Sequence, residues 1–178
     1  PEAELHVVKV LTDDGEGKMA SVMDGITFAI NYGMDVLSIS LGTQDKLPIP
    51  FQERIMQAYN AGITIVCSTG NSGFNDANYP ARMDEVIAVG GLDKELNIAT
   101  FSNGGHDVLA PAVEILSTYK DKKYARITGT SMASPLVAGG IALLISHYRN
   151  QGKEISPREI MDKIDGLDGI FDLTKLID

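Results

Sequence analysis

A serine at the start of a long apolar segment is the residue of this chain best suited to chemistry. Ser131 follows a tight turn at Gly129, and the sequence after it reads as a helix. The first N–H groups of a helix have no intrahelical partner and attract negative charge. Such a position suits a nucleophile, because those N–H groups can hold an oxyanion that develops during attack on a carbonyl. On residue type alone, a helix-capping serine is the commoner outcome.

Two further candidate sites come directly after predicted strands. Asn71 follows Gly70 and the strand predicted at Ile63–Ser68, and its side-chain amide can donate to the same oxyanion. The backbone at Ser40–Gly42 ends another predicted strand and can pair with an extended peptide. Ligand sites in open α/β sheets gather at the carboxyl ends of the strands, so we expect these sites to lie near Ser131.

Alternating strands and helices are predicted to position these sites. Short apolar runs rich in β-branched residues indicate buried strands, and apolar residues three and four apart indicate helices. Strands are expected at Leu5–Leu11, Val36–Leu41, Ile63–Ser68 and Val86–Val89, and helices at Met19–Tyr32 and Phe51–Asn60. Strand and helix alternate with short links, as in a parallel sheet wound with helices. The predicted fold class is therefore α/β, a mostly parallel doubly wound sheet flanked by helices.

The second half is predicted to add an antiparallel hairpin and two helices. Ile115–Tyr119 and Tyr124–Ile127, joined by a short polar turn, form the hairpin. Pro135–Tyr148 is apolar nearly all round, as expected of a helix buried in a core. Ser156-Pro157 begins the last helix. No linker or repeat divides the chain, so we expect one partial catalytic domain over residues 1–178.

Composition and charge exclude several classes of protein. The net charge of −9 repels phosphate backbones, so we expect no nucleic-acid partner. No apolar run approaches the roughly 20 residues that span a bilayer, so we expect no membrane association. The single cysteine, Cys67, excludes an internal disulfide and favours the cytoplasm. Secretion stays open, because the chain begins at Pro1 without an initiator methionine.

Five motifs, in order, resemble the subtilisin-like serine proteases. They are Ser40-Leu41-Gly42, Gly70-Asn71, Tyr79-Pro80, Ala110-Pro111 and Gly129–Gly139. Three further segments are most similar to the bacterial intracellular branch of that family: Val66-Cys67-Ser68, Val86–Gly90 and the Ser117–Gly129 hairpin. The likeness runs from about Val8 to about Ser146. It implies a serine endopeptidase that cuts peptides or proteins through an acyl-enzyme on Ser131, with Asn71 as the side-chain donor to the oxyanion.

The same resemblance implies binding residues. The substrate cleft would be lined by Ser40, Leu41 and Gly42, the primary specificity pocket walled by Ser68, Thr69 and Gly70, and the base of that pocket marked by Asn78. Asp107 resembles part of the family's weaker cation site, although a solvated carboxylate is the simpler interpretation. Calcium is implied for the intact enzyme, whose tighter site is built mostly from residues that this chain does not contain.

The aspartate and histidine that such a serine needs are not found in their family motifs. The resemblance places an Asp-Ser/Thr-Gly turn and a His-Gly-Thr-His helix start before a strand like Val7–Leu11. We expect His6 at the surface and His106 facing solvent. At a rise of ~1.5 Å per residue, a helix puts His147 roughly 24 Å from Ser131. The chain is therefore interpreted as the C-terminal two-thirds of a catalytic domain, inactive alone, and paired with the missing segment or self-associated.

Two other functions stay open. A non-catalytic pseudoprotease that binds peptides or regulates a partner is suggested by the missing base, whereas the joint presence of Ser131 and Asn71 argues against it. A nucleotide-binding domain is suggested by Thr69–Gly73 after a strand, but that loop matches neither a P-loop nor a G-x-G-x-x-G fingerprint.

Overall fold

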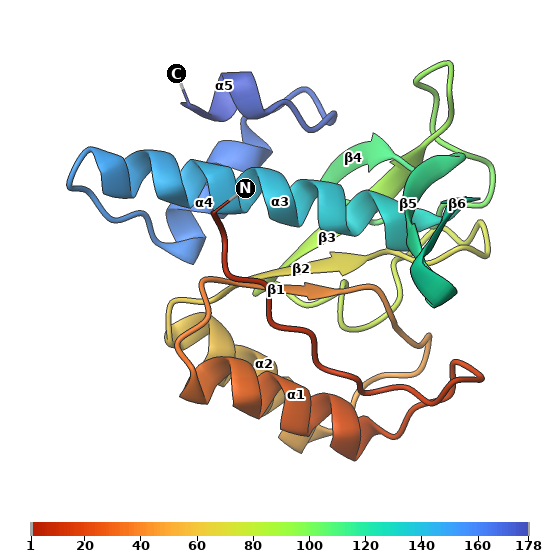
Figure 1. Ribbon diagram of the computed structural model, residues 1–178, viewed down its shortest axis with the longest axis horizontal. Helices are drawn as coiled ribbons and strands as arrows, with labels where there is room; N and C mark the ends of the chain where they lie inside the picture. The colour runs from red at the N-terminus through yellow and green to blue at the C-terminus, as the bar shows by residue number, and fades with distance from the viewer. Residues whose placement is uncertain (1, 178) are drawn as a thin grey trace.

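A parallel sheet forms the centre of the fold in the computed structural model, which describes residues 2–177. Its strands are β1 (Val36–Ile39), β2 (Thr64–Ser68), β3 (Val86–Leu92) and β4 (Val108–Pro111), and they lie side by side in that order. Helices cover both faces of the sheet (Figure 1). The predicted α/β class with a parallel sheet is confirmed, although β4 was not predicted as a strand.

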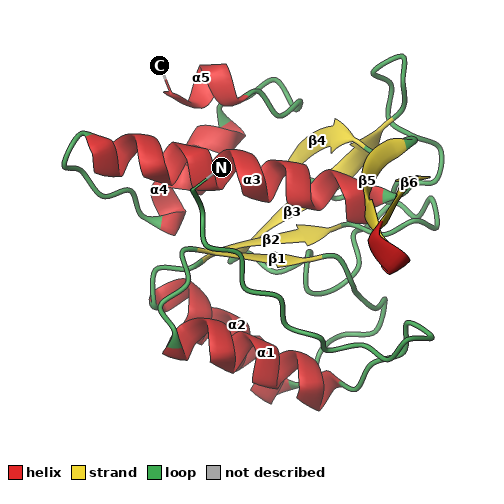
Figure 2. Ribbon diagram, in the orientation of Figure 1, coloured by secondary structure: helices red, strands yellow, loops and turns green. Residues whose placement is uncertain are grey.

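One face of the sheet is covered by α1 (Met19–Asn31) and α2 (Ile49–Asn60), and the other by α3 (Thr130–Asn150), α4 (Pro157–Asp165) and α5 (Leu173–Ile177) (Figure 2). Ser156 caps α4 in a capping box with Glu159, as its type and place predicted. The predicted helices are confirmed, with ends that differ by a few residues.

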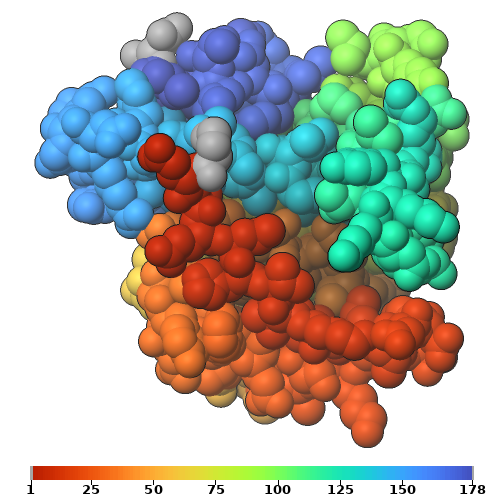
Figure 3. Space-filling model, viewed as in Figure 1, coloured from red at the N-terminus to blue at the C-terminus, as the bar shows by residue number. Residues whose placement is uncertain are grey.

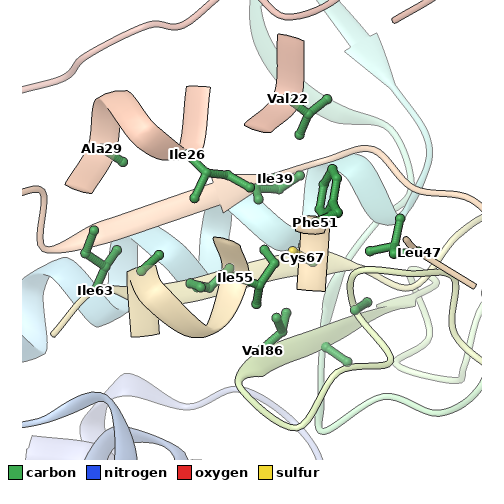
Figure 4. Packing of buried hydrophobic residues seen from close by; sticks show 14 of the residues in the cluster. Val22, Ile26, Ala29, Ile39, Leu47, Phe51, Ile55, Ile63, Cys67 and Val86 are labelled. Atoms are coloured by element: carbon green, nitrogen blue, oxygen red, sulfur yellow. The ribbon is translucent and has the colours of Figure 1, made fainter. Parts of the chain in front are cut away.

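Alternation along β2 divides the interior into two cores. Ile65 and Cys67 point toward α1 and α2, whereas Val66 points toward α3. The first core also contains Ile26 and Ile55 from the two helices (Figure 4). All five side chains are at most 1% exposed. Burial raises the pKa of the Cys67 thiol, as expected of a cysteine that packs rather than reacts.

α3 begins at Thr130, five residues before the predicted start at Pro135. An 18-residue window of this 21-residue helix has a mean hydropathy of 1.3, so by length and composition α3 could cross a membrane, contrary to our reading of the sequence. Half of that window is buried inside this fold, where α3 packs on the sheet. A core position accounts for the apolar composition of this helix.

A two-stranded antiparallel hairpin leads directly into α3. Its strands, β5 (Ile115–Tyr119) and β6 (Lys123–Ile127), pair Ile115 with Ile127 and Tyr119 with Lys123. The prediction of a hairpin is confirmed. This ribbon stands at the N-terminal end of α3 and delivers the chain to Ser131 (Figure 1).

The strand predicted at Leu5–Leu11 is wrong. The segment forms no strand, and among the described residues its only bridge is the local one between Leu11 and Gly17. Val8 and Val10 lie over Gly25 of α1, within 3.4 Å of the position that a Cβ would take there. Leu5 and Val7, on the other side, are 87% and 84% exposed, and the segment spreads over the surface (Figure 3). A β-prone segment forms a strand only beside a hydrogen-bonding neighbour, and residues 2–177 offer none to this segment.

Candidate active site

Ser131 lies in the first turn of α3, with its side chain free of any capping role. Gly129 is the N-cap, and no side chain caps this helix. The Ser131 hydroxyl donates to the carbonyl oxygen of Ser40 at 3.4 Å, and the Ser40 hydroxyl donates to the Ser131 carbonyl at 3.0 Å. In an α-helix the carbonyl of Ser131 would accept from the backbone N–H of residue 135, but Pro135 has none. The Ser40 hydroxyl supplies the missing donor. The helix start and the end of β1 are thereby joined.

Asn71 is anchored to the same helix start by its side-chain oxygen. Oδ1 accepts from the backbone N–H of Thr130 at 2.8 Å and from the Thr130 hydroxyl at 2.9 Å. A backbone N–H can only donate, so the atom that faces it must be the oxygen of the amide. The Asn71 side-chain nitrogen, Nδ2, lies next to Gly129, 3.3 Å from the position that a Cβ would take on that residue. It has no hydrogen-bond partner within residues 2–177, and it is the free donor of this group.

The loop that carries Asn71 depends on the glycine before it. Gly70 has a φ of +112°, a conformation that side-chain-bearing residues rarely adopt. A Cβ there would lie 2.5 Å from Nδ2 of Asn103 and 2.7 Å from Nδ2 of Asn78. The Gly70 N–H donates to the Thr130 hydroxyl at 3.2 Å. Thr130 therefore contacts two successive residues of the loop.

Asn78 lies between this loop and the segment that follows β1. Its Oδ1 accepts from Nε2 of Gln44 at 3.0 Å and from Nδ2 of Asn103 at 3.2 Å. Thr43 and Tyr79 exchange two backbone hydrogen bonds, of 2.9 and 2.8 Å. These bonds bring the segment that contains Ser40, Leu41 and Gly42 alongside Asn78.

The remaining predicted pocket residues lie at the end of β2. Ser68 and Thr69 are 5% and 0% exposed, and the Thr69 N–H donates to the Val89 carbonyl at 3.0 Å. The structure thus brings the candidates around one edge of the sheet: Ser131, Asn71, Ser40, Leu41, Gly42, Ser68, Thr69, Gly70 and Asn78. Their roles in binding and catalysis stay predictions.

Two residues of this region were missed at the level of sequence. Thr130 lies within the motif around Ser131, yet nothing in the motif says that it holds Asn71. Asn103, in the loop between β3 and β4, is 0% exposed and contacts the Asn71 loop. An asparagine beside Gly104 is typical of an exposed turn, so its burial has no local signal.

None of the histidines is hydrogen-bonded to Ser131 in the described part of the chain. His147 lies in the last turn of α3, with Nε2 2.7 Å from Nε2 of Gln151. His6 lies on the exposed N-terminal segment beside Phe28, as expected of a surface residue. The prediction that His106 faces solvent is wrong, because this residue is half-buried and its Nδ1 is buried without a hydrogen-bond partner among residues 2–177. Burial lowers the pKa of His106, and the nearby Asp107 opposes that shift.

Asp107 lines a cavity of about 530 Å³ together with Asp76, Asp84, Asp165, Arg82 and Arg158. Its Oδ2 accepts from the backbone N–H of Ala88 at 2.7 Å, and burial raises the pKa of this carboxyl. Within residues 2–177, no group of three or more histidine, cysteine, aspartate or glutamate side chains is placed to hold a metal. A role of Asp107 in binding a cation stays a prediction.

Curated relatives of known activity match most of this chain. Subtilisin DY from Bacillus licheniformis is 41% identical over 154 residues, which cover 83% of this chain and 56% of that protein. The major intracellular serine protease of Bacillus subtilis (strain 168) is 40% identical over 173 residues, 92% of this chain and 54% of that protein. The chain thus spans about half the length of these relatives.

Solved structures and a family model agree with these matches. The self-cleaved protease domain of PatA superposes with a TM-score of 0.86 at 25% identity, covering 96% of this chain and 71% of that one. The maturation protease PagA of prenylagaramide has the same fold, with a TM-score of 0.86 over 94% of this chain and 70% of that one, at 24% identity. A family model described as the subtilase family matches residues 1–165. This chain belongs to the subtilase family.

Proposed function

We propose that this chain carries the nucleophile and the oxyanion site of a serine endopeptidase. The observation that carries the proposal is the attachment of Asn71 to Thr130, next to Ser131, through two hydrogen bonds to its side-chain oxygen. That attachment leaves the amide nitrogen of Asn71 free beside the N–H groups that open α3. Membership of the subtilase family supports acyl transfer as the chemistry.

In the proposed reaction, Oγ of Ser131 attacks the carbonyl carbon of a peptide bond. The hydroxyl proton passes to a histidine base, and the carbonyl oxygen becomes an oxyanion that accepts hydrogen bonds from Nδ2 of Asn71 and the N–H of Ser131. The C–N bond then breaks, and the amine leaves with the proton from the histidine. Water hydrolyses the resulting ester of Ser131 by the same route and releases the acid.

We propose that the histidine and its orienting aspartate come from polypeptide that precedes Pro1. The hydroxyl of Ser131 donates to the carbonyl of Ser40 within the described residues, and a carbonyl oxygen cannot take the proton away. Without a base, a serine is a weak nucleophile. We therefore expect negligible hydrolysis by residues 1–178 alone.

The substrates of the complete enzyme are proposed to be extended peptides or proteins. Ser40, Leu41 and Gly42 follow β1 without entering the sheet, so their backbone can pair with a peptide strand. Ser68, Thr69 and Gly70 would form the wall of the specificity pocket, with Asn78 at its base. Because Ser68 and Thr69 are buried, we propose that their backbone groups, rather than their side chains, form the wall of the specificity pocket.

Labelling with a fluorophosphonate probe tests the proposal. Residues 1–178 are compared alone and together with the polypeptide encoded upstream of Pro1, and Ser131→Ala is the control. We expect labelling at Ser131 only in the combined protein. Rapid labelling of the chain alone would overturn its dependence on an upstream base. A combined protein that binds peptides but is neither labelled nor active would establish the pseudoprotease instead.

We also propose that the protein works inside the cell. The relative named as a major intracellular serine protease is matched over 92% of this chain, compared with 83% for Subtilisin DY. Cell fractionation with an antibody against this chain tests the proposal, and recovery from the culture medium would contradict it.

A further inference from the structure

Asn103 lies beneath the loop that carries Asn71 and is fully buried. We propose that Asn103 is the positioning residue that holds the Thr69–Phe74 loop, and through it the Asn71 amide, in the geometry that the oxyanion requires. The proposal rests on the function proposed above for Asn71. It adds a residue from the loop between β3 and β4, far from Asn71 in sequence, to the working parts of the site.

The side-chain oxygen of Asn103 holds the part of the loop that follows Asn71. Oδ1 accepts from the backbone N–H of Ser72 at 2.9 Å and from that of Phe74 at 3.1 Å. Ser72 is the next residue after Asn71. The direction in which the chain leaves Asn71 is therefore fixed by one buried oxygen.

Other groups of Asn103 hold the part that precedes Asn71. Nδ2 donates to the carbonyl of Thr69 at 3.0 Å, and the backbone N–H donates to the carbonyl of Gly70 at 3.0 Å. The backbone carbonyl of Asn103 accepts from the Thr69 hydroxyl at 3.1 Å. The loop is thus held on both sides of Asn71.

A second donation from Nδ2, to Oδ1 of Asn78 at 3.2 Å, ties the loop to the predicted base of the specificity pocket. With this bond, the side chain makes two donations and two acceptances, the full capacity of its amide. A buried polar group that is completely satisfied rigidifies its surroundings, whereas a partly satisfied one destabilises them. Aspartate would keep the two acceptances but lose both donations.

The loop needs this support because most of it is exposed. Asn71, Ser72, Gly73 and Phe74 are all exposed. A donor to an oxyanion acts only when it lies at hydrogen-bonding distance from the developing charge. A misplacement of about 1 Å costs on the order of a hundredfold in rate. The hydrogen bonds of the buried Asn103 hold this exposed loop in place.

The test is a double-mutant comparison in the complete enzyme, with active sites titrated so that misfolded protein is not counted. Asn103→Ala is expected to lower kcat roughly 10- to 100-fold with little change in KM, because the oxyanion forms only in the transition state. In an Asn71→Ala background, the same change is expected to alter kcat less than about twofold, because the group that Asn103 positions is already gone. Asn103→Asp, which keeps the size and the two acceptances, is the second variant should Asn103→Ala fail to fold.

Ser102→Ala is the matched control. Ser102 is buried next to Asn103, and its hydroxyl bonds to Gly91 and to the Asn103 carbonyl but not to the Asn71 loop. We expect its loss to lower stability and leave kcat unchanged. Amide exchange at Ser72 and Phe74, measured on the chain itself, should rise in Asn103→Ala and not in Ser102→Ala.

The outcomes separate this proposal from the proposed function. If Asn103→Ala lowers kcat equally with and without Asn71, or leaves both kcat and the exchange at Ser72 unchanged, Asn103 is not a positioning residue. If instead Asn71→Ala itself leaves kcat unchanged, the oxyanion role of Asn71 fails. The exchange rates then still report whether Asn103 holds the loop.

Discussion

Asn71 accepts two hydrogen bonds from one residue, Thr130, through a single side-chain oxygen, at 2.8 Å from the backbone N–H and 2.9 Å from the hydroxyl. Asn71 lies in the loop after β2 and Thr130 at the start of α3, and they meet beside Ser131. The anchor leaves the nitrogen of Asn71 free to donate. Thr130 thereby orients Nδ2 of Asn71, the donor proposed for the oxyanion.

Replacing Thr130 by valine removes one of these bonds and keeps the shape of the side chain. We expect kcat of the complete enzyme to fall by up to roughly tenfold, since a neutral hydrogen bond contributes about 1 kcal/mol. Asn71→Ala should cost more, roughly two to three orders of magnitude, a range that comes from an oxyanion donor in a subtilisin. Steady-state kinetics measure both. Thr130→Ser, which keeps the hydroxyl, is the control, and an equal loss in that variant would contradict the role of the hydroxyl.

Gly70→Ala should damage the site through the backbone. Its φ of +112° is strained for alanine, and the added Cβ would lie 2.5 Å from the Asn103 side chain. We expect a loss of about 1–3 kcal/mol in the free energy of unfolding, measured by urea denaturation. Gly62→Ala is the control, because Gly62 has a φ of +88° but open space around the Cβ position. Equal losses in the two variants would mean that crowding at Gly70 contributes nothing.

Neighbouring residues of α2 should differ sharply in their contribution to stability. Ile55 is 0% exposed in the core against β2 (Figure 4), whereas Met56 is 44% exposed. Ile55→Ala is expected to lower the free energy of unfolding by about 2–5 kcal/mol through lost burial and a cavity. Met56→Ala should change it by about 0.5 kcal/mol or less. Denaturant titration of both variants decides the point, and comparable losses would contradict the assignment of the core.

Stability should fall as the pH drops below about 6.5, the ordinary pKa of histidine, because burial lowers the pKa of His106 in the fold. In the unfolded chain this histidine takes up a proton near its ordinary pKa, whereas the folded chain keeps it neutral to lower pH. Protons therefore bind the unfolded state preferentially, and acid favours unfolding. His106→Asn should flatten the dependence of the unfolding free energy on pH below about 6.5. His147→Asn is the control, and a flattened profile there instead of at His106 would contradict the prediction.

The exposed N-terminal segment predicts association of the isolated chain. Leu5 and Val7 are 87% and 84% exposed on a β-prone stretch that has no partner strand in residues 2–177. Such surfaces promote pairing with another chain. Light scattering should show a mass above that of one chain at high concentration, reduced by Val7→Lys and not by Leu96→Lys, a substitution at another exposed leucine. A monomer at every concentration would count against the prediction.

Much of the fold follows from local patterns. The apolar spacing of Val22, Ile26, Ala29 and Ile30 predicts the buried face of α1; the first three are buried, and Ile30 is partly buried against the same core. The β-branched run at Ile63–Ser68 predicts β2, which the structure begins one residue later. The same reasoning fails at Leu5–Leu11, because strand formation depends on a neighbouring strand rather than on the segment alone.

By itself, the sequence determined the α/β class, the turn and long helix around Ser131, the loop at Asn71 and the family to which the chain belongs. These depend on residue types and on spacings over a few positions. Only the tertiary structure decided that Thr130 anchors Asn71, that Ser40 supplies the donor that Pro135 lacks, and that Asn103 is buried beneath the loop. Each of these contacts joins residues that lie about 30 to 90 positions apart. The register of the parallel sheet and the packing of α3 bring these distant residues together. Neither the register nor the packing can be predicted from a local sequence pattern.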